Sequence, residues 1–185
     1  KESDYKAAFE SYTPEVTAQI IKLDSEDKAK EVLEAAKAEG ADFAKIAKDN
    51  STDTATKDKG GEVKFDSGTA DIPSQVKEAA FKLDENGISD VITVSAGQNY
   101  SASYYIVKLN KKTEKGSDWK KYEKRLKEII IEGRKQDTNY IRSIIAKAMT
   151  NANIKVKDDA FKSTFNQYLQ NIGVETSDSS SSSKK

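Results

Sequence analysis

The sequence has 185 residues, of which 31 are basic and 31 acidic, so its formal net charge is zero. A balanced charge gives no electrostatic reason to expect nucleic acid as a partner. The chain contains neither cysteine nor histidine, which excludes disulfides and thiol catalysis and removes the side chain that titrates near neutral pH. No apolar run approaches the roughly 18 residues of a membrane-spanning helix, and no group of side chains indicates a metal or another cofactor.

The first expected elements are a helix and a strand. Residues 2–11 carry apolar side chains at helical spacing, and Pro14 ends this helix because proline disfavours helical geometry in the residue before it. Residues 16–23 are rich in apolar and β-branched side chains and read as a strand. Successive strand residues point to opposite faces, so if Ile20 points to the core, Gln19 points the other way, towards any cleft.

Two helices are expected next. The first spans about residues 26–39, with Asp24 or Ser25 as its cap and Gly40 as its end. Asp42 is the expected cap of a shorter helix, and a polar loop follows it.

The adjacent glycines Gly60 and Gly61 predict a sharp turn into a short strand over residues 62–65. Pro73 suits the first position of a following helix, where its missing N–H group costs nothing. These segments offer four apolar side chains to one surface, which is either a core or a cleft: Phe65, Ile72, Val76 and Phe81.

Two further strands complete the central region. Asn86 and Gly87 form an expected turn, and residues 88–95 and 103–110 have the composition of strands. The resulting order of strands and helices predicts an α+β sandwich.

The remaining sequence is helical in pattern. Apolar stripes run over residues 119–148, with a bend expected near Gly133. A short strand is expected at residues 154–156, a last helix at 158–169 and a disordered Ser-rich tail at 173–185. The stripes are too narrow for an independent core, so they need a packing partner, most simply the helix that ends at Tyr12 and the sequence before it. A homodimer through this region is a further expectation.

Five segments together resemble the parvulin-type peptidyl-prolyl isomerase domain. They are TAQIIKL (17–23), the helical stretch 26–53, GGEVKF (60–65), IPSQVKEAAFKLDENGISDVI (72–92) and YYIVKL (104–109), in a complete order. The resemblance implies a parvulin-like α+β domain over residues 14–110, with a four-stranded, mostly antiparallel sheet and flanking helices, plus an all-α flanking region.

The flanks are similar to PrsA-like extracytoplasmic foldase lipoproteins of Gram-positive bacteria, especially the streptococcal type. The resemblance implies that residues 1–13 end a helix of an N-terminal chaperone domain and that residues 111–172 form its C-terminal helical part. It also implies a location at the outer face of the cell membrane, through a lipid-modified cysteine that this chain lacks. Because a helix begins so near Lys1, we expect further sequence upstream.

In the parvulin family an apolar pocket holds the proline ring beside two histidines and an acidic or thiol residue. Matched residue by residue, both histidines are absent, and the implied catalytic residues are Gln19 and Tyr105 at those two positions and Asp53 at the acidic one. The implied substrate-binding residues are Phe65, Ile72, Val76 and Phe81. Simpler interpretations stay open: Gln19 is an exposed strand residue, Tyr105 a core aromatic and Asp53 a loop cap.

Two hypotheses follow for function. Rotating an Xaa-Pro bond needs no net proton transfer, and its barrier of roughly 18–20 kcal/mol comes from amide resonance, so the missing histidines do not forbid catalysis. We therefore expect a foldase for unfolded exported proteins with weak prolyl isomerase activity that is flat between about pH 5 and 8. The alternative is an inactive, parvulin-like chaperone that binds unfolded clients and their Xaa-Pro segments.

Overall fold

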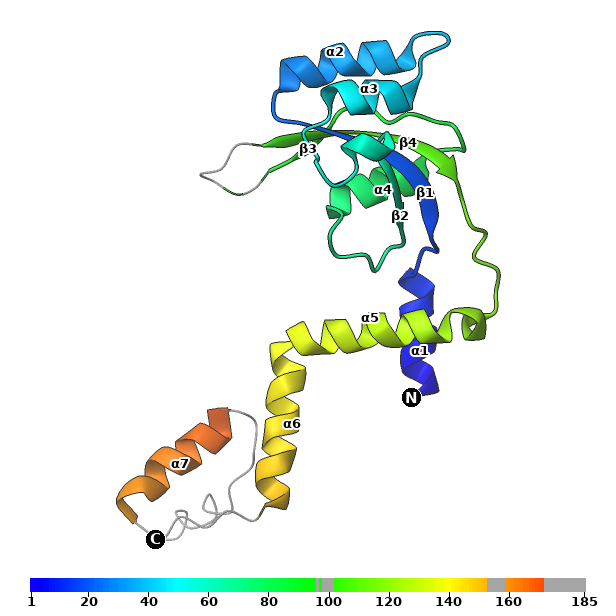
Figure 1. Cartoon of the computed structure of the whole chain (residues 1–185). Helices are drawn as coiled ribbons and strands as arrows, with labels where there is room; N and C mark the ends of the chain where they lie inside the picture. The colour runs from blue at the N-terminus through cyan, green and yellow to red at the C-terminus, as the bar shows by residue number, and fades with distance from the viewer. Residues whose placement is uncertain (96, 98–101, 153–158, 172–185) are drawn as a thin grey trace, which may run out of the picture. The chain divides into compact units, whose positions relative to one another are not determined.

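The computed structural model describes residues 1–95, 97, 102–152 and 159–171 of the chain (Figure 1). By its internal contacts the chain divides into two compact units, residues 6–121 and residues 1–5 with 122–185. Within the described part of the chain, no helix combines the length and the apolar character needed to cross a membrane.

Residues 6–121 are built on a four-stranded sheet, as predicted. The strands are β1 (Val16–Leu23), β2 (Glu62–Phe65), β3 (Ile92–Val94) and β4 (Ser103–Lys111). Their order is β2-β1-β4-β3, and each neighbouring pair is antiparallel. The two long strands, β1 and β4, therefore lie at the centre of the sheet.

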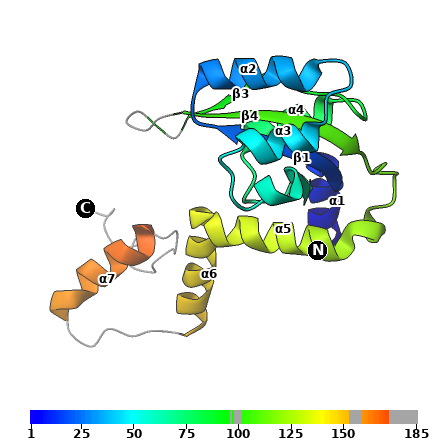
Figure 2. The ribbon, with the colours of Figure 1, turned by 45° about the horizontal axis from the view of Figure 1, so that its top comes forward.

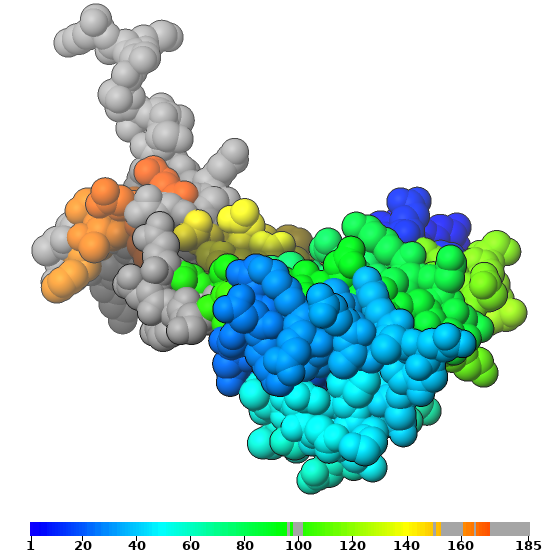
Figure 3. All heavy atoms as spheres, turned by 90° about the horizontal axis from the view of Figure 1, so that it is seen from above, coloured from blue at the N-terminus to red at the C-terminus, as the bar shows by residue number. Residues whose placement is uncertain are grey.

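Helices cover both faces of this sheet. The helices α2 (Glu26–Lys37) and α3 (Phe43–Asn50) lie on one face, and α4 (Ser74–Lys82) lies on the other (Figures 1 and 2). Seen from above in Figure 3, the surface of residues 26–50 forms a continuous blue-to-cyan cover. We call the two sides the α2–α3 face and the α4 face.

Each face of the sheet has its own apolar core. On the α4 face, Ile20 and Val107 pack with Val76 and with other buried side chains. On the α2–α3 face, Ile21 and Ile106 pack with apolar residues of α2 and α3. The alternation of strand side chains explains this division, because consecutive residues such as 20 and 21 point to opposite faces.

The helix caps follow the local sequence. The side chain of Ser25 accepts a hydrogen bond from the Lys28 amide, and that of Asp42 accepts one from the Lys45 amide, as the sequence predicts. The prediction for Pro73 is wrong by one position: its ψ of 141° is extended, and its carbonyl accepts the first bond of a helix that begins at Ser74. Pro73 is thus the cap of α4.

The strand predicted over residues 88–95 is shorter than expected. Only Ile92–Val94 forms β3, while Ile88 makes an isolated bridge to Lys108. Between them, the hydroxyl of Ser89 accepts a hydrogen bond from the Val107 amide, at 3.0 Å. A side-chain oxygen therefore takes the place of a backbone acceptor, and regular strand pairing stops there.

The remaining elements are helical, and one of their predicted boundaries is wrong. They are α1 (Glu2–Ser11), α5 (Glu123–Gln136), α6 (Thr138–Asn151), α7 (Asp159–Asn171) and the short 3-10 helices η1 (Lys57–Lys59) and η2 (Trp119–Tyr122). The break expected near Gly133 lies at Asp137, whose carboxylate accepts hydrogen bonds from the amides of Asn139 and Tyr140. A capping side chain, not the glycine, starts α6. The strand predicted at 154–156 and the Ser-rich tail lie outside the described residues.

Candidate functional site

The predicted substrate-binding residues belong to the apolar cluster on the α4 face, but they are not equally accessible. Phe65 is 1% exposed and Val76 is 0% exposed, so these two side chains form the floor of the cluster. Ile72 and Phe81 are only partly buried and lie at its margin. Ile72 and Phe81 are therefore accessible to a ligand, whereas Phe65 and Val76 are buried and cannot contact one directly.

Phe81 lies at a different end of the cluster from Tyr105. Its ring centroid is 5.8 Å from that of Phe65, which pairs with Val16 at the start of β1. Tyr105 pairs with Lys22, six residues further along β1, a distance of roughly 20 Å along a strand. Phe81, which the resemblance places in the proline pocket, therefore packs beside Phe65 at the end of the cluster away from Tyr105.

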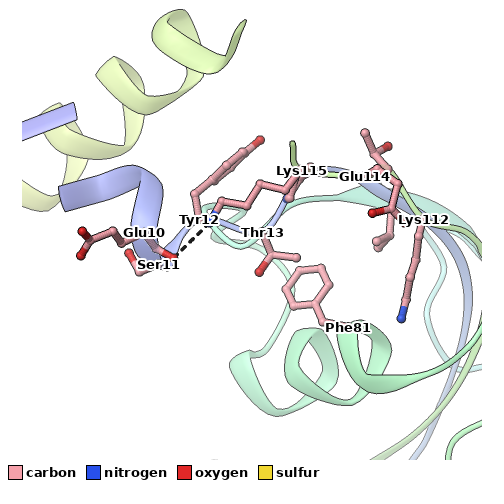
Figure 4. A pocket seen from close by; sticks show the side chains of 11 residues that line it. Glu10, Ser11, Tyr12, Thr13, Phe81, Lys112, Glu114 and Lys115 are labelled. Carbon is pink, nitrogen blue, oxygen red and sulfur yellow. Dashed lines mark hydrogen bonds between the residues drawn. The ribbon is translucent and has the colours of Figure 1, made fainter. Parts of the chain in front are cut away.

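Phe81 instead lines a hollow of about 410 Å³ between the segments that lead into and out of the sheet (Figure 4). The other lining residues are 10–14, 16 and 112–115. The ammonium group of Lys115 closes one side by donating to the Glu10 carbonyl at 3.0 Å. This hollow belongs to the junction of the incoming and outgoing chain and not to the predicted pocket.

Gln19 is also separated from Tyr105, because it lies on the α2–α3 face. Its register partner is Lys108, and its neighbours Ile20 and Ile21 divide between the two cores. The amide nitrogen of its side chain donates to the Gly60 carbonyl at 2.9 Å. Gln19 points away from Ile20, as predicted, but the face to which it points is covered by α2 and α3 and is not the face of Tyr105.

The glycine pair holds the loop before β2 against the edge of β1, and the predicted sharp turn is confirmed. Gly60 and Gly61 have φ values of 67° and 79°, in the left-handed region that glycine tolerates best. The Ile20 amide donates to the Gly61 carbonyl at 2.8 Å. A Cβ atom added at Gly61 would lie 2.4 Å from the Ile20 carbonyl oxygen, so only glycine fits this approach.

The same loop positions Asp53 beside the end of β1. The amide of Lys22 donates to the Ser51 hydroxyl at 3.1 Å, and the amide of Thr52 donates to the Lys22 carbonyl at 2.8 Å. The Asp53 carboxylate accepts hydrogen bonds from the Ala55 amide and, at 2.6 Å, from the Thr56 hydroxyl. Asp53 is thus the loop cap of the simpler interpretation, held next to the strand segment that pairs with Tyr105.

Tyr105 lies on the α4 face and is only partly buried. Burial raises the pKa of its phenol, and the negative charges of Asp53 and Asp24 raise it further. The hydroxyl therefore remains a neutral hydrogen-bond donor at physiological pH.

Apolar side chains stand beside Tyr105. Ile92 is its cross-strand partner on β3 and packs on the same cluster. The helix α4 packs on this face against β3 and β4 (Figure 1). Ile72, two residues before α4, packs on the same cluster. We call Tyr105, Ile92, Ile72 and Asp53 the Tyr105 site. Sequence reasoning missed Ile92, and only the pairing register of β3 with β4 could have identified it.

The Tyr105 site combines two apolar side chains and one neutral donor with the carboxylate of Asp53. Such a surface can remove water from a proline ring and its peptide bond, and it can donate a hydrogen bond, but it offers no group that titrates near neutrality. Among the described residues there is also no cluster of three or more acidic side chains placed to hold a metal ion.

The chain is similar to known foldases over most of its length. It is 65% identical over 172 residues to "Foldase protein PrsA" of Streptococcus sanguinis (strain SK36), which covers 93% of this chain and 51% of the relative. The protein of the same name from Streptococcus gordonii (strain Challis) is 60% identical over 183 residues, covering 99% of this chain and 57% of the relative. The chain thus spans about half the length of these curated relatives.

A solved structure has the same fold. The crystal structure of foldase protein PrsA from Streptococcus pneumoniae str. Canada MDR_19A matches with a TM-score of 0.84 and 56% identity, over 91% of this chain and 61% of that chain. The family model described as "Rotamase: PPIC-type PPIASE domain" matches residues 13–111, which contain the whole sheet and the Tyr105 site. The chain therefore belongs to the PPIC-type peptidyl-prolyl isomerase (rotamase) domain family.

Proposed function

We propose that this chain is part of an extracytoplasmic foldase that assists the folding of exported proteins by weak prolyl isomerisation at the Tyr105 site. The observation that carries the proposal is the family match over residues 13–111. This region includes Tyr105, which is partly buried at the margin of the apolar cluster on the α4 face. The similarity to proteins named foldase PrsA supports the wider role. By the same analogy, the full-length protein is held at the outer face of a Gram-positive cell membrane by a lipid anchor outside this chain.

The proposed domain organisation follows the same analogy. Residues 14–110 form the isomerase domain, and residues 1–13 and 111–172 belong to a helical chaperone part. The family match over residues 13–111 supports these limits. The internal contacts divide the chain at nearby positions, with one unit over residues 6–121.

The proposed chemistry needs only desolvation and one hydrogen bond. Ile72 and Ile92 would hold the proline ring and exclude water from the peptide bond, which favours the twisted state because that state is less polar than the planar amide. The Tyr105 hydroxyl would donate to the peptide group as the bond rotates. A neutral hydrogen bond contributes about 0.5–1.5 kcal/mol, so we expect a modest rate enhancement.

A second candidate function is client binding without turnover. It is favoured by the absence of histidine from the chain and by an exposed apolar face on α5 and α6. Ile131, Ile141 and Ile144 are 42%, 41% and 48% exposed, and they line a shallow hollow of about 390 Å³. An apolar surface of this kind suits unfolded segments or a second copy of the chain.

Exchange spectroscopy by NMR on a blocked Ala-Pro peptide tests the isomerase proposal directly. The chain should accelerate cis–trans exchange, and Tyr105→Phe should lower the acceleration about two- to tenfold, the value of one neutral hydrogen bond. The matched control is Tyr168→Phe, a 49% exposed tyrosine on α7, which should change nothing.

The outcomes separate the two functions. An unchanged rate in Tyr105→Phe would remove the assigned role of the phenol. If the chain accelerates no exchange but suppresses aggregation of an unfolded client, binding without turnover replaces isomerisation as the function.

A further inference from the structure

We propose that the Tyr105 site prefers Xaa-Pro segments that carry a basic residue next to the proline, because Asp24 and Asp53 place two carboxylates at its rim. This inference rests on the proposed function and refines it by naming the substrate class. The site itself follows from the family match and the apolar cluster. The carboxylates determine only which peptides it accepts.

The two carboxylates are held at the same end of β1, one just after the strand and the other in the loop that follows α3. Asp24 follows directly after the last residue of the strand and accepts a hydrogen bond from the Thr52 hydroxyl at 3.3 Å. Thr52 is fastened to the carbonyl of Lys22, and Asp53 follows it in the chain. One anchored loop therefore brings both negative charges to the end of β1, where Lys22 pairs with Tyr105.

The two carboxylates also lie on the side of Tyr105 opposite to its apolar partner on β3. The apolar partners of Tyr105 come from β3 and α4, whereas β1 and its loop lie on the opposite side of β4. A proline ring held near Ile92 would place its peptide bond at Tyr105 and its neighbouring residue towards Asp24 and Asp53. That both charges raise the pKa of the Tyr105 phenol supports their reach into the site.

One positive group must be set against them. Lys22 is the register partner of Tyr105 and shares its face of the sheet. The proposal is that the two carboxylates outweigh the ammonium group of Lys22 for a flexible, solvated peptide. Partly exposed charge pairs are weak, so we expect a preference of about two- to tenfold in affinity, which should diminish at high salt.

The test compares blocked peptides with Lys, Gln or Glu directly before the proline and, in a second series, directly after it. Binding is followed by NMR titration of the whole chain, and cis–trans exchange is recorded in the same samples. In at least one series the Lys peptide should bind about two- to tenfold more tightly than the Glu peptide. Raising NaCl to about 0.5 M should reduce this ratio, since the screening length falls below that at physiological salt.

Neutral variants of the same shape locate the effect. Asp24→Asn keeps an acceptor oxygen for Thr52, and Asp53→Asn keeps one of the two acceptor oxygens that Ala55 and Thr56 use. This double variant should bring the Lys/Glu ratio close to one. If Asp24 and Asp53 only maintained the structure of the loop, the double variant would change the affinity for all three peptides by the same factor. The control Asp84→Asn removes an exposed charge from the turn near Leu109, at the other end of β4, and should leave the ratio unchanged.

Three results would overturn the inference. They are equal affinity for Lys and Glu peptides in both series, a ratio that survives in the double variant, and a ratio that salt does not change. Any of these leaves the proposed function standing if the peptides still bind. If no peptide binds and no exchange is accelerated, the proposed function fails, and the charge preference fails with it.

Discussion

Gly61→Ala should destabilise the chain far more than an ordinary glycine-to-alanine change. The new Cβ would lie 2.4 Å from the Ile20 carbonyl oxygen and 3.1 Å from the Ile20 nitrogen, both backbone atoms of the central strand β1. Neither atom can move without shifting the sheet. The variant must therefore break the hydrogen bond from the Ile20 amide to the Gly61 carbonyl or distort the strand.

The magnitude follows from three contributions. A left-handed φ costs a residue with a side chain about 1–2 kcal/mol, one lost backbone hydrogen bond about 0.5–1.5 kcal/mol, and overpacking about 1–3 kcal/mol. We expect the free energy of unfolding to fall by about 3–5 kcal/mol.

Gly40→Ala is the matched control, because Gly40 has a similar φ of 73° but no atom within 4 Å of its added Cβ. The Gly40→Ala variant should lose only the cost of the left-handed backbone conformation, about 1–2 kcal/mol of the free energy of unfolding. Urea unfolding followed by circular dichroism gives both values, and hydrogen exchange at the Ile20 amide reports the broken bond locally. The prediction is refuted if the two variants lose equal stability and the Ile20 amide stays protected in Gly61→Ala. The close approach of loop and strand would then contribute nothing to the free energy of unfolding.

Two further predictions concern the core and the titration of the site. Phe65 is 1% exposed, so Phe65→Ala should lower the free energy of unfolding in urea by about 3–5 kcal/mol. Phe161 on α7 is 66% exposed, so Phe161→Ala should change that free energy by less than about 0.5 kcal/mol. Equal losses of stability would contradict the assigned core. Isomerisation by the tag-free chain should be independent of pH between about 5 and 8 because it has no histidine. Since burial and the charges of Asp53 and Asp24 raise the pKa of Tyr105, loss of its proton and of the activity should come only above the ordinary tyrosine value of about 10; a bell-shaped profile near neutrality would contradict this.

Local chemistry was enough to identify most of the elements. The helix over residues 2–11, the strand over 16–23 and the cap at Asp42 were all predicted correctly. Each depends on side chains within a few positions of one another: a proline that ends a helix, a run of apolar residues, a carboxylate that accepts a nearby amide. The left-handed turn at Gly60 and Gly61 was predictable for the same reason.

Local chemistry was not enough to show which side chains meet. Gln19 and Tyr105 come from neighbouring strands, but the pairing register and the presence of helices on both faces put them on opposite sides of the sheet. Phe81 follows Val76 by little more than one helical turn, yet it faces a junction far from Tyr105. These placements depend on contacts between segments distant in the chain, for which the sequence carries no nearby signal. The absence of histidine, by contrast, needs no coordinates, and it already limits any catalysis here to chemistry without a group that titrates near neutral pH.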